Sequence, residues 1–276
     1  MSVKIIVDST VDLSPEMKQK VSAVVPLSVL FGETVYQDGV TITAAEFYEK
    51  LEGADPLPTT SQPTPAVFED IYREATADGS QAVVITLSSR LSGTYQSATI
   101  AAEEFPGQVF VVDSRNATLG SGVLAAYAVE LAEAGKTGEE ILEILMEARK
   151  RVRLYAIVDT LEYLKKGGRL SATVAFVGGM LNLKPLISVE EGEIKSLGTA
   201  RGMKKAFSQL SELSANVDPA MPMLLGYTGA EDTQMRGYAD SSRELWGENV
   251  PVTVVGPTIG VHAGPGAVAV GFFSKE

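Results

Sequence analysis

A short buried strand that leads directly into a hydroxyl-rich loop constrains this chain more than any other stretch. Residues 82–87 form an apolar, β-branched run bounded by polar residues, which is typical of a buried strand. Residues 88–97 follow with several hydroxyl side chains and one glycine, but with no His, Asp or Glu. Residues 95–104 then show a helical pattern. Open α/β sheets bind ligands at such strand-to-helix loops, and free backbone N–H groups there favour an anion. The sequence therefore predicts a loop that holds an anion without attacking it.

Strand and helix patterns alternate along the first half of the chain, which favours a mostly parallel sheet. Beyond residue 152 the pattern changes, because an evident hairpin over residues 185–197 is mixed with helices. We therefore expect an α/β fold of two domains, with an α/β domain over residues 1–152 and an α+β domain over residues 153–276. Between Arg169 and the hairpin, residues 172–181 predict a helix that is apolar all round and able to pack in a core or line an apolar tunnel.

Phosphate-binding motifs for nucleotides are not evident. Gly135, Lys136 and Thr137 imitate the end of a P-loop, but Glu130 stands where that motif needs its first glycine. The stretch also follows a helix, and Thr137 with Glu140 is better explained as a capping box that begins a new helix. No glycine-rich fingerprint follows the first strand, so a dinucleotide fold of the usual kind is not expected.

The composition excludes several classes of protein. The net charge of −12 argues against nucleic acid or an anionic membrane surface as the main partner. The absence of cysteine excludes disulfides, thiolate metal sites and thiol catalysis. No apolar run approaches the ~20 residues that span a bilayer, and the amino terminus has no signal-peptide layout. We expect a cytoplasmic protein without stable membrane insertion, although transient membrane contact stays open.

Two charged or titratable side chains stand out as candidates for a binding site. His262 is the only histidine and lies in a glycine-rich stretch, 259–266, which we expect to be a loop whose N–H groups form an anion nest. Arg169 follows a glycine-terminated helix, where its guanidinium could hold a carboxylate or phosphate through two bonds. A structural histidine and a salt bridge at a helix corner are the simpler alternatives. A metal site is not expected, because one histidine without thiols is a poor set of ligands.

Six segments, in order along the whole chain, together resemble the DegV family, whose members include the fatty-acid-binding subunits of bacterial fatty acid kinase. The motifs that carry the resemblance include Leu-Ser-Gly-Thr-Tyr-Gln-Ser-Ala and Leu-Glu-Tyr-Leu-Lys-Lys-Gly-Gly-Arg. The six segments are residues 8–13, 60–64, 91–98, 112–114, 161–169 and 262–266.

The resemblance implies a long-chain fatty acid bound in a tunnel between two domains. Its carboxylate is expected to meet hydroxyls at Thr60 and Ser92, with Arg169 and His262 near the head group. A separate ATP-binding kinase subunit would then phosphorylate that carboxylate to an acyl phosphate, so the chain itself needs no cofactor and no catalytic residue. The substrate-binding set predicted in this way is Thr60, Ser61, Ser92, Gly93, Thr94, Arg169 and His262.

Two other functions stay open from the sequence. The chain is alternatively a lipid carrier or sensor that works without a kinase. A serine hydrolase would use Ser92, His262 and either Asp8 or Asp113, but Ser92 does not lie in a G-x-S-x-G elbow. The sequence does not indicate whether Arg169 and His262 act in binding or in transfer, nor the preferred acyl chain or the oligomeric state.

Overall fold

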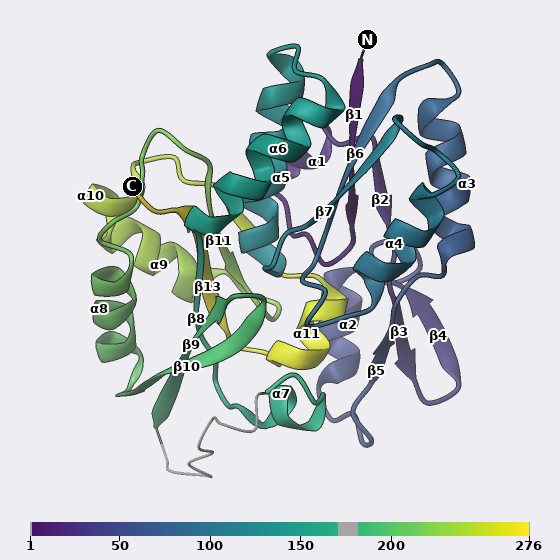
Figure 1. Cartoon of the computed structure of the whole chain (residues 1–276). Helices are drawn as coiled ribbons and strands as arrows, with labels where there is room; N and C mark the ends of the chain where they lie inside the picture. Colours follow the sequence, from purple (N-terminus) through teal and green to yellow (C-terminus); the bar gives the residue numbers. More distant parts are fainter. Residues whose placement is uncertain (1, 171–181, 276) are drawn as a thin grey trace.

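The computed structural model describes residues 2–170 and 182–275. Within these residues the chain forms three β-sheets, and helix α5 (Thr118–Glu133) lies between the two larger ones (Figure 1). The expected apolar helix at residues 172–181 lies outside the described residues. The expected α/β fold is confirmed, with a parallel sheet followed by a mixed sheet along the chain.

The first sheet has four strands, all parallel, in the order β2-β1-β6-β7. Both of its faces are covered by helices, which explains why its strands are apolar without a clear alternation. Ile6 and Val84 pack with α3 and α4, whereas Ile5 and Val83 contribute to the core that contains α5 and α6. The strands and their covering helices are β1 (Val3–Asp8), β2 (Ala23–Val25), β6 (Gln81–Thr86), β7 (Val109–Asp113), α3 (Pro65–Thr76), α4 (Thr94–Ala102) and α6 (Gly138–Ala148).

The second sheet has six strands of mixed direction, in the order β10-β9-β8-β13-β11-β12. One face packs on α8, α9 and α10, and the other packs on α5 so closely that a Cβ at Gly226 or Gly271 would stand 2.7–2.8 Å from Leu119. The expected hairpin is β9 with β10. The elements are β8 (Val152–Ile157), β9 (Leu183–Glu190), β10 (Glu193–Arg201), β11 (Met223–Tyr227), β12 (Val252–Val254), β13 (Val268–Phe273), α8 (Met203–Leu213), α9 (Thr233–Ser241) and α10 (Arg243–Trp246).

A third, three-stranded sheet was not expected from the sequence. The apolar run at residues 24–30 divides at Pro26, so that its two halves enter different sheets as β2 and β3. The proline-rich segment near residue 60 also supplies an edge strand, β5, which pairs with β3 through Thr60 and Val29. The elements of this sheet and the remaining helices are β3 (Ser28–Phe31), β4 (Thr34–Gln37), β5 (Thr59–Ser61), α1 (Pro15–Lys18), α2 (Ala44–Leu51), η1 (Arg149–Arg151), α7 (Glu162–Lys166) and α11 (Pro257–Ala263).

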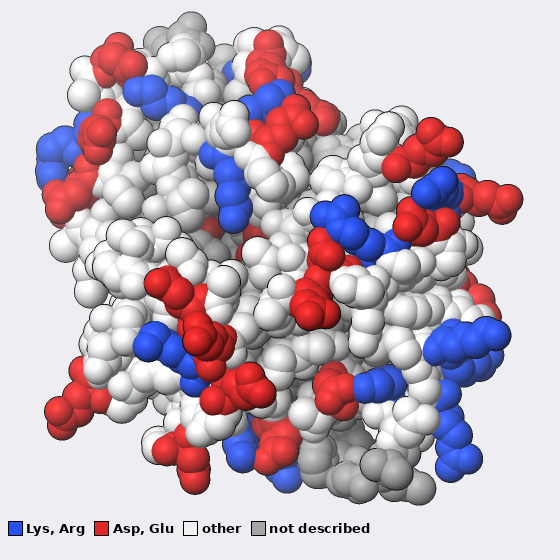
Figure 2. Space-filling view, turned by 180° about the vertical axis from the view of Figure 1, so that it is seen from behind, with Lys and Arg blue, Asp and Glu red and all other residues white. Residues whose placement is uncertain are grey.

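Charged side chains lie mainly on the surface and are mixed in sign. On the face shown in Figure 2, basic and acidic groups are interspersed, and the described residues form no extended basic surface there. Among the described residues, no helix combines the length and apolarity that a bilayer crossing needs.

Candidate functional site

A cavity of about 420 Å³ lies between the mixed sheet and the loops at the carboxyl ends of the parallel strands. Its walls are mostly apolar, and such a volume falls within the range of small-molecule sites. Strands β8, β9 and β13 supply one wall, and the loop after β6, the beginning of α5 and α11 supply much of the rest. Apolar side chains on the walls include Leu27, Leu87, Leu91, Leu154, Val158, Leu164, Ile187, Val189 and Ile194.

The sequence-predicted site residues gather on the wall of this cavity, although they come from four separate parts of the chain. Thr94 is the exception: it is fully buried beside the cavity, and its hydroxyl lies 3.0 Å from the hydroxyl of Ser92. Whether these residues bind a ligand stays a prediction. The six that line the cavity are Thr60, Ser61, Ser92, Gly93, Arg169 and His262.

His262 does not lie in a glycine-rich loop, as expected, but near the carboxyl end of helix α11. Pro257 occupies the first turn, where its missing N–H is harmless. Gly260 lies within the helix, and its neighbours leave no room for a side chain at this position, because a Cβ there would lie 2.5 Å from Phe47. Only Gly264 and Gly266, with φ of +70° and +77°, form the turn that ends the helix. The expected anion nest around His262 is therefore wrong.

Thr60 and His262 meet although 202 residues separate them in sequence. The hydroxyl of Thr60 lies 3.1 Å from Nε2 of His262. Burial, and then the positive charge of Arg169, lower the pKa of His262 to about 4. The imidazole is therefore neutral at neutral pH. Its other nitrogen, Nδ1, is buried and has no hydrogen-bond partner among the described residues.

Gly167 explains how the imidazole fits against the end of α7. A Cβ at Gly167 would stand 2.2 Å from Nδ1 of His262, so a side chain at this position would displace the ring. The backbone of Gly167 also accepts a hydrogen bond from Nη1 of Arg169 at 2.7 Å. One glycine thus positions both the histidine and the arginine.

Arg169 supplies a positive charge that no carboxylate among the described residues neutralises. Its Nε donates to the carbonyl of Leu91 at 3.2 Å, which holds the guanidinium beside the hydroxyl-rich loop. In the part of the chain that the structure describes, Arg169 forms hydrogen bonds only to backbone carbonyls and no ion pair. The predicted alternative of a salt bridge at this corner is therefore not observed there. An anion in the cavity would find a preformed cation at this end.

Asp8 and Gln62 hold the loop from Ser88 to Thr94 in position. Asp8, at the end of β1, accepts a hydrogen bond from the N–H of Leu87 at 2.8 Å and fixes the start of the loop. Gln62 packs against Gly93 so closely that a Cβ there would lie 2.2 Å from its amide oxygen. Gln62 also lines the cavity, and the predicted set omitted it although it belongs to the quoted motif around Thr60.

Sequence reasoning also missed two buried carboxyl groups at the amino end of α11. Asp12 accepts from the N–H of Gly256 at 2.8 Å and from the hydroxyl of Thr118 at 2.6 Å. Asp38 accepts from the N–H of Thr258 at 3.0 Å. Burial raises the pKa of both groups, for Asp12 to about 7. Aspartates after strands are a weak signal in the sequence, because nothing local indicates which distant helix they cap.

The geometry offers little to the serine hydrolase alternative. His262 bonds Thr60, Ser92 bonds Thr94, and Asp8 is engaged by Thr10 and Leu87. Asp113 accepts from Ser89 and Arg115. No Ser-His-Asp relay forms among the described residues. Within those residues there is also no cluster of three His, Asp or Glu side chains suited to a metal ion.

Fold and cavity together define an α/β protein that encloses an apolar chamber with one polar, cationic end. A model of the DegV family matches residues 2–275. A DegV domain-containing protein of Deinococcus radiodurans is 38% identical over 98% of both chains. The chain therefore belongs to the DegV family.

Solved structures agree with this assignment. A fatty-acid-binding DegV family protein from Thermus thermophilus superposes with a TM-score of 0.89, at 35% identity over 100% of both chains. DegV from Bacillus subtilis, described as a fatty acid binding protein, gives a TM-score of 0.86 at 31% identity over 100% of both chains.

Proposed function

We propose that this protein binds a long-chain fatty acid in the cavity and presents its carboxylate to a separate ATP-binding kinase subunit. The acyl chain occupies the apolar part of the cavity. The carboxylate lies at the polar end, where the hydroxyls of Thr60 and Ser92 donate hydrogen bonds, His262 orients Thr60 through its Nε2, and Arg169 supplies the opposite charge. The kinase subunit transfers a phosphoryl group from ATP to a carboxylate oxygen, which yields an acyl phosphate and ADP.

The observation that carries this proposal is the guanidinium of Arg169, which forms no ion pair in the described part of the chain and lies at the end of an apolar cavity. A buried anion is costly unless it is paired and hydrogen-bonded, and here the pairing groups are already in place. An apolar chain alone would not need them, and a small anion alone would not need the apolar walls. A molecule with both parts fits. The structures from Thermus thermophilus and Bacillus subtilis, both described as fatty-acid binding, support this reading.

Simple magnitudes agree with tight retention. Burial of about 14 to 16 methylene groups contributes roughly 11–13 kcal/mol at ~0.8 kcal/mol for each. The loss of translational and conformational freedom on binding offsets a large part of this. The remainder is still enough for a lipid to stay bound through purification.

Access to the head group supports the phosphorylation step. A second hollow, of about 670 Å³, is lined by residues 54–60 and by α7, and it shares Thr60, Arg169 and His262 with the main cavity. A phosphate donor held by a partner in this hollow would face the carboxylate directly.

Extraction of the purified protein with organic solvent, followed by mass spectrometry, tests the binding step. We expect about one fatty acid per chain. A protein that is empty and shows no affinity for added long-chain fatty acids would refute the proposal. Addition of a fatty acid kinase subunit and ATP then tests the second step, because acyl phosphate should form. A lipid-loaded protein that never yields acyl phosphate with any such subunit would instead favour the stand-alone carrier or sensor.

A further inference from the structure

The tip of the β9–β10 hairpin projects beyond the sheet that supports it. Pairing between β8 and β9 covers Leu186 to Ser188 and stops there. Beyond Ser188 the two strands pair only with one another around the turn at Glu191 and Gly192. Yet Val189 and Ile194, which flank this tip, line the cavity. The tip is therefore a wall of the cavity that the described part of the sheet does not hold in place.

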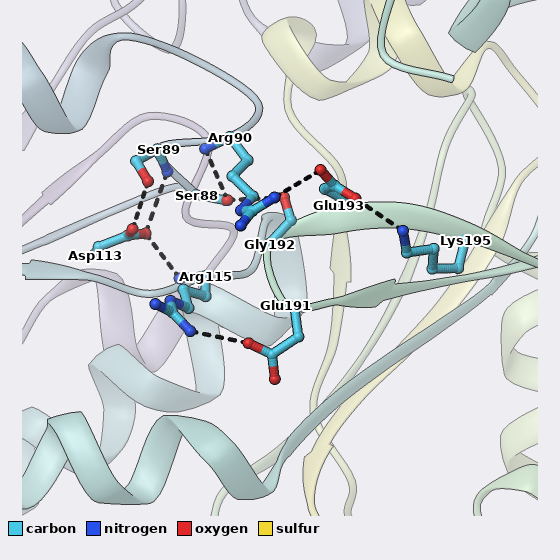
Figure 3. Close-up of polar contacts among 9 residues, drawn as sticks. All are labelled: Ser88, Ser89, Arg90, Asp113, Arg115, Glu191, Gly192, Glu193 and Lys195. Atoms are coloured by element: carbon cyan, nitrogen blue, oxygen red, sulfur yellow. Dashed lines mark hydrogen bonds and ion pairs between the residues drawn. The ribbon is translucent and has the colours of Figure 1, made fainter. Parts of the chain in front are cut away.

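Besides the apolar packing of Val189 and Ile194 in the main core, two loops of the parallel sheet hold the tip through three polar contacts (Figure 3). We call this set the clasp. The hydroxyl of Ser88 donates to the carbonyl of Gly192 at 2.8 Å, in a buried position. The other two contacts are ion pairs, Arg90–Glu193 at 2.8 Å and Arg115–Glu191 at 2.9 Å. The partners are 76–104 residues apart in sequence.

The loops and the turn are shaped to make these contacts. Asp113 accepts hydrogen bonds from the N–H groups of Ser89 and Arg115, at 3.2 and 2.9 Å, and so fixes both loops together. The turn has positive φ at both central residues, +49° for Glu191 and +85° for Gly192, as a two-residue type I′ hairpin requires. A Cβ at Gly192 would also stand 2.5 Å from the hydroxyl of Ser88. Glycine is thus required there both for the turn and for the contact.

The clasp is weak enough to open. The side chains of Arg90 and Arg115 are 59% and 50% exposed, and those of Glu193 and Glu191 are 40% and 81% exposed. Exposed ion pairs contribute little to stability and are screened by salt. Among the three contacts of the clasp only the Ser88–Gly192 bond is buried, and the apolar packing of Val189 and Ile194 acts beside it.

A hollow of about 390 Å³ lies directly beside the Arg90–Glu193 pair. Leu91, Arg169 and Ile194 line both this hollow and the cavity, so they form the partition between the two spaces. Movement of the hairpin tip away from the loop would separate Ile194 from Leu91 and join the two spaces. Arg169, which is proposed to pair with the carboxylate, lies in this partition.

We propose that the clasp controls release of the bound acyl chain, which leaves through the gap that opens between Leu91 and Ile194. The inference rests on the proposed binding of a fatty acid. If the clasp acts in this way, the rate of release depends on ionic strength and on the ion pairs at the hairpin tip, whereas the capacity to bind does not.

Release of cis-parinarate, a fluorescent long-chain fatty acid, into an excess of phosphatidylcholine vesicles measures this rate. The double variant Arg90→Gln with Arg115→Gln should release the probe roughly threefold to tenfold faster than the wild type at low salt. At about 1 M salt, where screening is strong, the two rates should converge. Arg73→Gln is the matched control, because it removes an exposed ion pair on α3, away from the cavity, and should leave the rate unchanged.

A charge exchange separates the ion pair from a general loss of packing. Arg115→Glu alone should speed release, and the added Glu191→Arg should restore the slow rate, because Arg115 and Glu191 pair with one another. Circular dichroism confirms that each variant is folded. A folded double variant that releases the probe at the wild-type rate would overturn the clasp. A wild type that does not bind the probe at all would instead refute the proposed function.

Discussion

The two ends of helix α11 carry buried polar clusters that differ in the kind of group they hold and in what those groups pair with. At the amino end, Asp12 and Asp38 accept hydrogen bonds from the backbone N–H groups of Gly256 and Thr258, which joins the helix to two distant loops, while the hydroxyl of Thr258 has no partner among the described residues. At the carboxyl end, His262 keeps a buried nitrogen without a partner among the described residues. Carboxyl groups that accept backbone N–H groups at the start of a helix join parts of a fold, whereas an unpaired imidazole nitrogen near a cation without an ion pair leaves room for an anionic ligand.

The difference in charge follows the same division. The amino end holds carboxyl groups whose pKa burial raises, and the positive end of the helix dipole lies beside them. The carboxyl end holds Arg169, which forms no ion pair within the described residues, and a neutral imidazole. One short helix thus connects a structural junction to a candidate anion site, and substitutions at its two ends should affect different properties.

The largest expected effect is on stability, at the amino end. Asp12→Ala leaves the hydroxyl of Thr118 and the N–H of Gly256 without their acceptor in a buried place. We expect the free energy of unfolding to fall by about 3 kcal/mol, measured by urea denaturation. Asp70→Ala, which removes an exposed ion pair on α3, is the control and should change it by less than about 0.5 kcal/mol. Equal effects of the two substitutions would contradict the structural role of Asp12.

The pH dependence of stability distinguishes the two ends by sign. The pKa of His262 is lowered to about 4, from an ordinary value of 6.5, so the unfolded chain binds a proton that the folded protein does not. The stability that the protein keeps because His262 is neutral is fully present above pH 6.5 and is lost as the pH falls toward 4. Between pH 7.5 and 5 it amounts to about 2 kcal/mol.

The pKa of Asp12 is raised to about 7, so its linked contribution has the opposite sign and weakens as the pH rises from about 4 to 7. Urea denaturation of the wild type and of His262→Gln across this pH range isolates the contribution of His262 to the pH dependence of the free energy of unfolding. The variant should lose less stability on acidification than the wild type. The same slope in both proteins would show that His262 is not held neutral.

Arg169→Gln should affect ligand affinity and leave stability nearly unchanged. Loss of the charged partner should weaken binding of a long-chain fatty acid roughly tenfold to thirtyfold, as expected for a hydrogen bond to a charged group. Binding of the fatty alcohol of the same length should change little, because it has no charge. Calorimetric titration of both ligands gives the comparison. An equal loss for acid and alcohol would mean that Arg169 shapes the cavity and does not pair with an anion.

The smallest effects are expected from the neutral hydroxyls. Ser92→Ala and Thr60→Ala should each weaken fatty-acid binding roughly fivefold, which corresponds to one neutral hydrogen bond. Thr41→Ala, at an exposed turn beyond β4, removes a hydroxyl from a surface turn and should leave affinity unchanged. If neither site substitution changes affinity or acyl phosphate formation, the head group lies elsewhere in the cavity.

Local signals in the sequence determined much of the secondary structure. The capping box at Thr137 and the hairpin within residues 185–197 lie where their patterns predict, because caps and tight turns depend on neighbours in the chain. The candidate site residues were found through the motifs of the DegV family, and the structure places six of the seven on one cavity.

The tertiary structure alone decided which distant groups meet. Thr60 reaches His262 because β5 joins an unexpected third sheet, and the carboxylates of Asp12 and Asp38 find a helix more than 200 residues away. Likewise, whether a buried charge is paired depends on every element packed around it, which no local pattern records. For this reason the sequence indicated the polar groups of the site, but only the fold showed that Arg169 lies at the end of an apolar cavity with no carboxylate paired to it in the described part of the chain.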